Sequence, residues 1–104
     1  MINNEMSDKA ILSELGLRIL RHRLNKNITQ NTLAVEAGVS ESTIQRVESG
    51  ASIQLLKLMR ILRILNLIEN LETLAPGLAV SPLQQLKMRI EVRQRASSQQ
   101  KNNK

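Results

Sequence analysis

Few side chains in this sequence have the chemistry that catalysis or metal binding requires. The chain contains no cysteine, so it has no thiolate nucleophile, no thiolate metal ligand and no disulfide. Its one histidine, His22, lies in a basic stretch, where a surface or packing role is more typical than ligation or base catalysis. No pair of carboxylates has a catalytic neighbourhood, and no glycine-rich phosphate loop occurs. We therefore expect no enzyme, no metal and no cofactor, which leaves hydrogen bonding and charge as the available chemistry.

The most informative spacing lies in residues 29–50, TQNTLAVEAGVSESTIQRVESG. Small or apolar residues stand there at the offsets that two short helices around a tight turn require: Ala34, Gly38, Ile44 and Val47. Ala34 lets the helices approach closely, and Gly38 can adopt the positive φ that other side chains resist. The other two would form the buried face of the second helix. This spacing is typical of a DNA-reading helix-turn-helix over about residues 30–49.

Hydrophobic periodicity and capping signals predict six helices. With their caps, the expected helices cover about residues 8–24, 29–38, 40–50, 53–65 and 67–74, with a sixth that begins at 82. Thr29, Ser40 and Ser52 are the expected N-caps of the second, third and fourth helices. The fifth helix follows Asn66, whose spacing to a glutamate three positions on is of the capping type.

The sixth expected helix opens with Ser-Pro-Leu-Gln at residues 81–84. Serine at the N-cap, proline in the first helical position and glutamine three positions after the cap form a strong start signal. We expect this helix to fray beyond Arg93 and residues 97–104 to be disordered, because they are polar throughout.

The apolar residues are dominated by leucine and isoleucine, and the chain contains no Phe, Tyr or Trp. Leucine-rich segments without β-type alternation favour an all-α fold. A core without large aromatics is modest, so burial between two subunits would help, and we expect a homodimer. Nucleic-acid modules that stack bases on aromatic side chains are excluded.

The net charge of +6 is concentrated at the C-terminal end, where residues 84–104 carry six basic residues and one acid. Such a basic tail favours polyanions, although a soluble extension has the same composition. We expect a flexible lead over residues 1–7, a domain over 8–77 and a basic extension over 78–104. Without a signal peptide or an apolar run long enough to span a bilayer, the sequence favours a cytoplasmic protein and no membrane partner.

The chain resembles the phage-repressor/Cro-like (XRE-type) helix-turn-helix family over about residues 15–74. The resemblance depends on LGLRILRHRL, ITQNTLAVEAGVS, STIQRVESG and the leucine-rich fourth helix. It implies a five-helix, lambda-repressor-like domain, usually dimeric, which places the N-terminal half of its third helix in the major groove. The expected fold is therefore an all-α, five-helix helix-turn-helix domain with a helical, basic C-terminal extension. The expected function is sequence-specific binding of double-stranded operator DNA by a transcriptional regulator, with autoregulating repression favoured.

The resemblance also assigns roles to individual residues of the segment. The residues that match the base-reading face of the third helix, residues 40–49, are Glu41, Ser42, Gln45 and Arg46. Those expected to contact phosphate are Thr29, Gln30, Ser40 and Thr43. Arg23 and Glu48 match a buried ion pair that ties the first helix to the end of the third.

The base-facing residues have suitable chemistry. Arg46 can donate two hydrogen bonds to guanine, Gln45 suits adenine, and Glu41 accepts from cytosine. Because a carboxylate is repelled by phosphate, we expect Glu41 to reject wrong sequences more than it attracts the right one. The plainer interpretation is that Gln30, Ser42 and Gln45 are ordinary solvated residues. A row of cations on the fourth helix is more typical of a solvated face than of a DNA clamp: Lys57, Arg60 and Arg63.

The extension favours an alternative function. The segment SPLQQLKMRIEVRQRAS resembles, more weakly, tails of family members that accompany kinase-like toxins. The alternative is an antitoxin of a type II toxin–antitoxin pair, which binds and neutralises such a toxin and represses its own operon. Under either function, the charge of the extension allows a DNA arm, a toxin-binding helix or a dimer brace, and the sequence does not choose between them. Four apolar residues of the fifth helix complete the core, form a dimer interface, or do both: Leu67, Ile68, Leu71 and Leu74.

Overall fold

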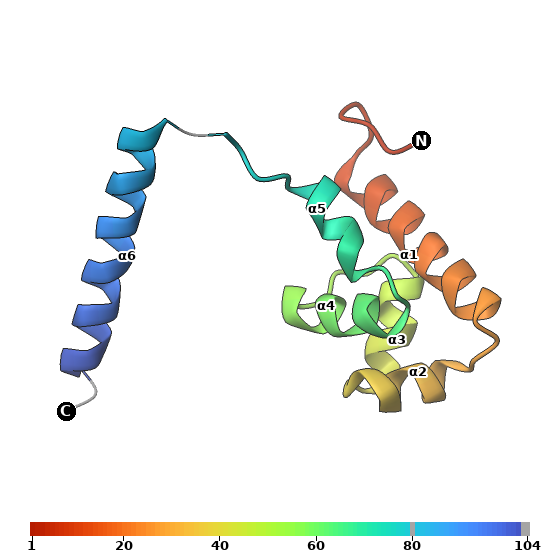
Figure 1. Ribbon diagram of the computed structural model, residues 1–104. Helices are drawn as coiled ribbons and strands as arrows, with labels where there is room; N and C mark the ends of the chain where they lie inside the picture. The colour runs from red at the N-terminus through yellow and green to blue at the C-terminus, as the bar shows by residue number, and fades with distance from the viewer. Residues whose placement is uncertain (80, 103–104) are drawn as a thin grey trace. The chain divides into compact units, whose positions relative to one another are not determined.

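A computed structural model describes residues 1–79 and 81–102, and every regular element in these residues is a helix (Figure 1). The elements are α1 (Asp8–Asn25), α2 (Gln30–Ala37), α3 (Glu41–Glu48), α4 (Leu55–Ile64), the 3-10 turn η1 (Ile68–Asn70), α5 (Leu71–Leu74) and α6 (Pro82–Asn102). The all-α prediction is confirmed. The chain divides into two compact units, Met1–Leu74 and a second that begins at Ala75.

Side-chain caps begin the first three helices. The hydroxyl oxygens of Ser7, Thr29 and Ser40 accept hydrogen bonds from backbone N–H groups three residues further on, at 3.1, 3.0 and 3.1 Å. Each bond satisfies one of the N–H groups that a helix start leaves without a partner. The predicted caps at Thr29 and Ser40 are therefore confirmed.

Residues with a left-handed backbone conformation (positive φ) follow the ends of these helices. Gly38 has φ 69° and Gly50 has φ 87°, and each follows a helix that stops as predicted. Asn27 and Asn66 adopt the same region, at φ 62° and 61°. Asn66 therefore terminates α4 and does not cap the next turn, because η1 begins after Leu67 with no side-chain cap. The expected capping role of Asn66 was wrong.

The start of α4 also differs from the prediction. The helix begins at Leu55 after Gln54, which makes no side-chain cap bond, so Ser52 is not its N-cap. The cause is tertiary, since Ile53 packs against the core and the chain remains extended through Gln54 before it turns into the helix. The first residues of α4, Leu55 and Leu56, are exposed, and no side chain caps the N–H groups at this end of the helix.

The core of the first unit joins its four longest helices. Eight hydrophobic residues are buried: Ile19, Leu33, Ala34, Ala37, Ile44, Val47, Ile61 and Leu65. One side chain from each of α1, α2, α3 and α4 is at most 1% exposed: Ile19, Leu33, Ile44 and Ile61. Each buried aliphatic side chain of this size contributes about 1.5–3 kcal/mol of hydrophobic stabilisation. The core therefore fixes α3 between α1 and α2, which both contact it.

Two further contacts lock α1 in place. Gly16 lies so close to the end of α3 that a Cβ there would be 2.2 Å from the carbonyl oxygen of Val47. Lys26, just past the end of α1, donates a hydrogen bond to the carbonyl oxygen of Ile64 at the end of α4. The sequence analysis predicted neither contact.

The second unit contains α6. The predicted capping box is present: Ser81 N–H donates to Gln84 Oε1 at 3.1 Å, and Gln84 N–H donates to Ser81 Oγ at 3.3 Å. The helix continues to Asn102, past the predicted fraying point at Arg93 and through most of the segment expected to be disordered. No glycine or proline interrupts it after its first residue, and its residues are mostly good helix formers. Residues 103 and 104 of that segment lie outside the described residues.

No helix within residues 1–79 or 81–102 has both the length and the apolar character needed to cross a membrane.

Candidate nucleic-acid interface

The two faces of α3 have opposite environments. Thr43, Ile44 and Val47 are buried against the neighbouring helices, at 6%, 0% and 4% exposure. The four residues expected to read bases are all exposed: Glu41, Ser42, Gln45 and Arg46. The structure therefore brings these four to the outer side of one rigidly packed helix, which is the arrangement that contact with base edges requires. Their contact with bases stays a prediction.

A residue that the sequence analysis missed holds Glu41. The amide Nδ2 of Asn31, in the first turn of α2, donates to Glu41 Oε2 at 3.3 Å. Both residues are exposed, so this bond orients the carboxylate more than it stabilises the fold. One carboxylate oxygen remains to accept a hydrogen bond from a base.

Arg46 is also held by a partner outside α3. Its Nη2 donates to the backbone carbonyl oxygen of Ser52 at 3.1 Å. Arg46 and Ser52 both line an open hollow of about 520 Å³ between the first turns of α3 and α4. The hollow also contains the side chains of Ser40, Ser42 and Lys57. Two cations and several hydroxyls face the same space, which suits an anion such as a phosphate.

The expected phosphate-contacting residues have different surroundings. Ser40 and Thr29 are exposed, but both hydroxyls cap their helices. The hydroxyl of Thr43 lies 2.8 Å from Ser40 Oγ, and Thr43 is only 6% exposed, so it has little free surface for a ligand. Gln30 is half-buried at the start of α2, where its amide already has a protein partner.

That partner is Glu48, the centre of a buried polar network. Arg23 Nε and Nη2 donate to the two carboxylate oxygens of Glu48 at 2.7 and 3.0 Å, which makes a two-point ion pair. Arg23 Nη1 donates to the carbonyl oxygen of Ile28 at 3.0 Å, and Gln30 Nε2 donates to Glu48 Oε1 at 3.0 Å. The network links α1, the start of α2 and the end of α3.

Because the network is buried, each of its charges needs a partner within the protein. The side chains of Arg23 and Glu48 are 9% and 5% exposed, so each charge has lost most of its hydration. The hydrogen bonds that Arg23 donates to Glu48, together with the negative charge of that carboxylate, raise the pKa of Arg23 above its usual value, and so the guanidinium stays charged. The pair expected from the resemblance is therefore present, with Gln30 as an additional member that the sequence analysis did not foresee.

The cationic row of α4 is divided between two environments. Lys57 is half-buried and lines the hollow beside Arg46, whereas Arg60 and Arg63 are exposed elsewhere on the helix. Lys57 therefore belongs to the candidate interface. In the part of the chain that the structure describes, no three His, Cys, Asp or Glu side chains gather as metal ligands would.

Residues 19–69 match a family model described as helix-turn-helix. No curated protein matches the chain. The matched residues include the buried core, the turn at Gly38 and the whole of α3. The chain thus belongs to the helix-turn-helix proteins of the phage-repressor/Cro (XRE) type. This is a family of DNA-binding regulators and not of enzymes.

Proposed function

We propose that this protein is a sequence-specific, double-stranded DNA-binding regulator that represses its own promoter. It acts in the cytoplasm as a homodimer. The observation that carries the proposal is the position of Glu41, Gln45 and Arg46 on the exposed face of a helix whose opposite face is fully packed. A short helix anchored in this way can enter the major groove without losing its shape.

Each exposed side chain has a distinct task at the bases. Arg46 leaves the carbonyl oxygen of Ser52 and donates two hydrogen bonds to a guanine. Gln45 pairs with an adenine, and Glu41, oriented by Asn31, accepts from a cytosine. A good two-point contact contributes about 1–3 kcal/mol of discrimination against the wrong base.

Phosphate contacts position the helix. The hollow beside the first turns of α3 and α4 offers Lys57 and serine hydroxyls to the DNA backbone. Because Glu48 accepts a hydrogen bond from the Gln30 amide, the remaining amide hydrogen and the backbone N–H groups at the start of α2 can face a second phosphate. Neutralisation of phosphates makes the affinity fall steeply with salt.

The experiment is a titration of labelled duplex from upstream of the gene, followed by fluorescence anisotropy over a salt series with competitor DNA. The proposal expects competitor-resistant binding with two subunits per site. Binding that any duplex competes away equally would contradict it. Lys57→Ala should weaken binding to all duplexes alike and reduce the salt slope, whereas Arg60→Ala, on the same helix but outside the hollow, is the matched control.

A second function has support from α6. This capped helix exposes Leu83, Leu86 and Ile90, which lie at helical spacing, and its cations outnumber its single acid. An exposed apolar stripe is better suited to contact with a protein partner than to contact with a phosphate backbone. Under this alternative the protein is an antitoxin, and α6 binds a kinase-like toxin.

Deletion of residues 84–104 separates the two roles. If the extension contacts DNA, the truncated protein should bind its operator more weakly and with a flatter salt slope. An unchanged slope would assign the extension to another partner. In that case, replacement of Leu83, Leu86 and Ile90 by serine in the full chain should abolish neutralisation of a toxin encoded beside the gene while leaving DNA binding intact.

A further inference from the structure

The first unit has an apolar groove whose lining includes none of the four residues expected to read bases. The groove, of about 380 Å³, lies between α1, α4 and the η1–α5 segment. Half-buried leucines from all three elements line it, among them Leu15, Leu62 and Leu71. Its volume falls within the range of small-molecule sites, about 300–1,000 Å³. An occupant of the groove would therefore leave the exposed face of α3 free.

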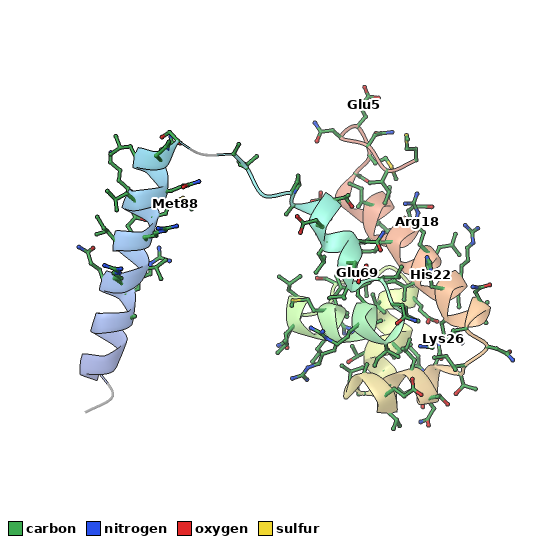
Figure 2. The ribbon with its side chains drawn as sticks, in the orientation of Figure 1. Glu5, Arg18, His22, Lys26, Glu69 and Met88 are labelled. Carbon is green, nitrogen blue, oxygen red and sulfur yellow. The ribbon has the colours of Figure 1, made fainter. Side chains whose placement is uncertain are left out.

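The lining combines a large apolar area with a few polar side chains. Nine of the twelve lining residues are leucine, isoleucine or methionine, and the other three are Arg18, His22 and Asn70. Arg18 and His22 follow one another by one turn on α1 (Figure 2), whereas Asn70 lies on η1. A mostly apolar lining with a small number of polar groups that orient the ligand is typical of small-molecule sites.

The polar side chains of the groove are hydrogen-bond donors, and none of them is an acid. Arg18 donates to Glu14 Oε1 through Nε, at 3.1 Å, and this bond leaves its Nη groups to meet another anion. The imidazole of His22 and the amide of Asn70 also offer N–H groups. Glu14 and the two acids of the η1–α5 segment do not line the groove. The charge of the lining is therefore complementary to a single anionic group, which a guanidinium binds strongly.

The apolar part of the groove favours an aliphatic chain as its occupant. The sequence contains no Phe, Tyr or Trp, so the groove has no aromatic face on which a flat ring could stack. Met59 also lines the groove, and its flexible side chain can adjust to a chain that bends. The most exposed apolar residues of the lining are Leu55 and Leu74, at 69% and 75% exposure, and a bound chain would cover both. Burial of these side chains would stabilise the complex.

We propose that the groove binds an amphiphilic carboxylate, a small molecule with one anionic head and an unbranched aliphatic chain. The carboxylate accepts hydrogen bonds from Arg18 and His22, and the chain lies among the leucines of α4 and the η1–α5 segment. Because the three elements form the groove only when the first unit is folded, the ligand stabilises this unit against unfolding. The site goes beyond the proposed function and does not depend on it.

Thermal unfolding of the full chain with octanoate, kept below the concentration at which it forms micelles, tests the proposal. Octanoate should raise the melting temperature as its concentration rises. Octanol has the same chain without the charge, so it should bind about tenfold more weakly. Octyltrimethylammonium, which carries the opposite charge, should not bind. Equal binding of octanoate and octanol would show a non-selective apolar surface and would overturn the proposal.

Two arginines of α1 and two leucines of α4 make matched pairs of variants. Arg18 and Leu55 line the groove, whereas Arg21 and Leu56 do not, and all four are exposed, so their replacement leaves the fold intact. Arg18→Gln should weaken octanoate binding about tenfold and leave octanol binding unchanged, and Arg21→Gln should bind both as the wild type does. Leu55→Gln should weaken both ligands, and Leu56→Gln neither. Equal effects within either pair would overturn the proposal, and melting temperatures without ligand show that each variant is folded.

A second copy of the chain is the competing occupant of the groove. In that case octanoate would leave the melting temperature unchanged, and Leu55→Gln would shift the sedimentation of the chain towards the monomer. That pair of results would overturn the proposal. All of these measurements are made without DNA, so their failure would leave the operator titration unaffected. Selective binding of octanoate would likewise support the site even if the chain showed no preference among duplexes.

Discussion

The two ends of α3 are built on different principles. At the C-terminal end, Glu48 is enclosed by Arg23 and Gln30, and the backbone at Val47 lies against Gly16 of α1. At the N-terminal end, Glu41 and Ser42 are exposed, and the carboxylate of Glu41 accepts a single hydrogen bond from another helix, donated by the exposed Asn31. The C-terminal end fixes the helix within the protein, whereas the N-terminal end is exposed and carries the residues proposed to read bases.

This difference has an energetic consequence. Changes at the C-terminal end remove partners from buried charges or force backbones apart, both of which are costly. Changes at the exposed end cost little stability because water replaces the lost contacts. Stability and DNA reading should therefore separate along a helix of eight residues.

The largest expected effect comes from Glu48→Ala. It leaves the buried guanidinium of Arg23 without its carboxylate, and the loss of stability should be about 3–5 kcal/mol. Urea unfolding measures this loss of stability. The variant that remains folded should prefer the same DNA sequence as the wild type. Arg18→Ala is the control: its ion pair with Glu14 joins side chains that are 46% and 33% exposed, and its loss should cost at most about 0.5 kcal/mol. Equal costs for the two substitutions would remove the distinction between the buried and exposed pairs.

Gly16→Ala should have the next largest effect. The added methyl group would meet a backbone carbonyl, which cannot rotate away, so α1 and α3 must separate. We expect a loss of about 1–3 kcal/mol or more by thermal or urea unfolding. Gly77→Ala adds the same methyl group in open space and should leave the melting temperature of the domain unchanged. A stable Gly16→Ala protein would show that the two helices are not in close contact.

Ser40→Ala should have a smaller effect. The N–H of Thr43 loses its cap acceptor, and the Thr43 hydroxyl loses its neighbour, for about 1 kcal/mol. Ser42→Ala, at an exposed site that caps nothing, should fall within about 0.5 kcal/mol of the wild type. If Ser42→Ala were the more destabilising change, the capping role of Ser40 would be wrong.

Much of the fold could be predicted because its signals are local. Thr29 and Ser40 cap their helices through bonds to residues three positions away, and Gly38 ends α2 through its own φ angle. The capping box of α6 is local as well. Because each of these features depends on a few neighbouring residues, it can be recognised from a short stretch of sequence.

The missed features depend on contacts between distant parts of the chain. The approach of Gly16 to Val47 depends on how α1 crosses α3, although a glycine within an apolar helix pattern was a usable signal. The bonds of Asn31 to Glu41 and of Gln30 to Glu48 join different helices, and no spacing rule predicts them. The late start of α4 has the same origin, since the burial of Ile53 overrides the capping signal of Ser52.

The most direct test of the central claim, that the exposed face of α3 reads bases, is selection of preferred sites from a random duplex library. The wild type and Arg46→Ala would be compared under the same salt. We predict a twofold-symmetric site for the wild type, loss of preference at one base pair of each half-site in the variant, and unchanged helicity by circular dichroism. An unchanged preferred site in Arg46→Ala would remove this residue from the reading face, and no preferred site in the wild type would contradict the account as a whole.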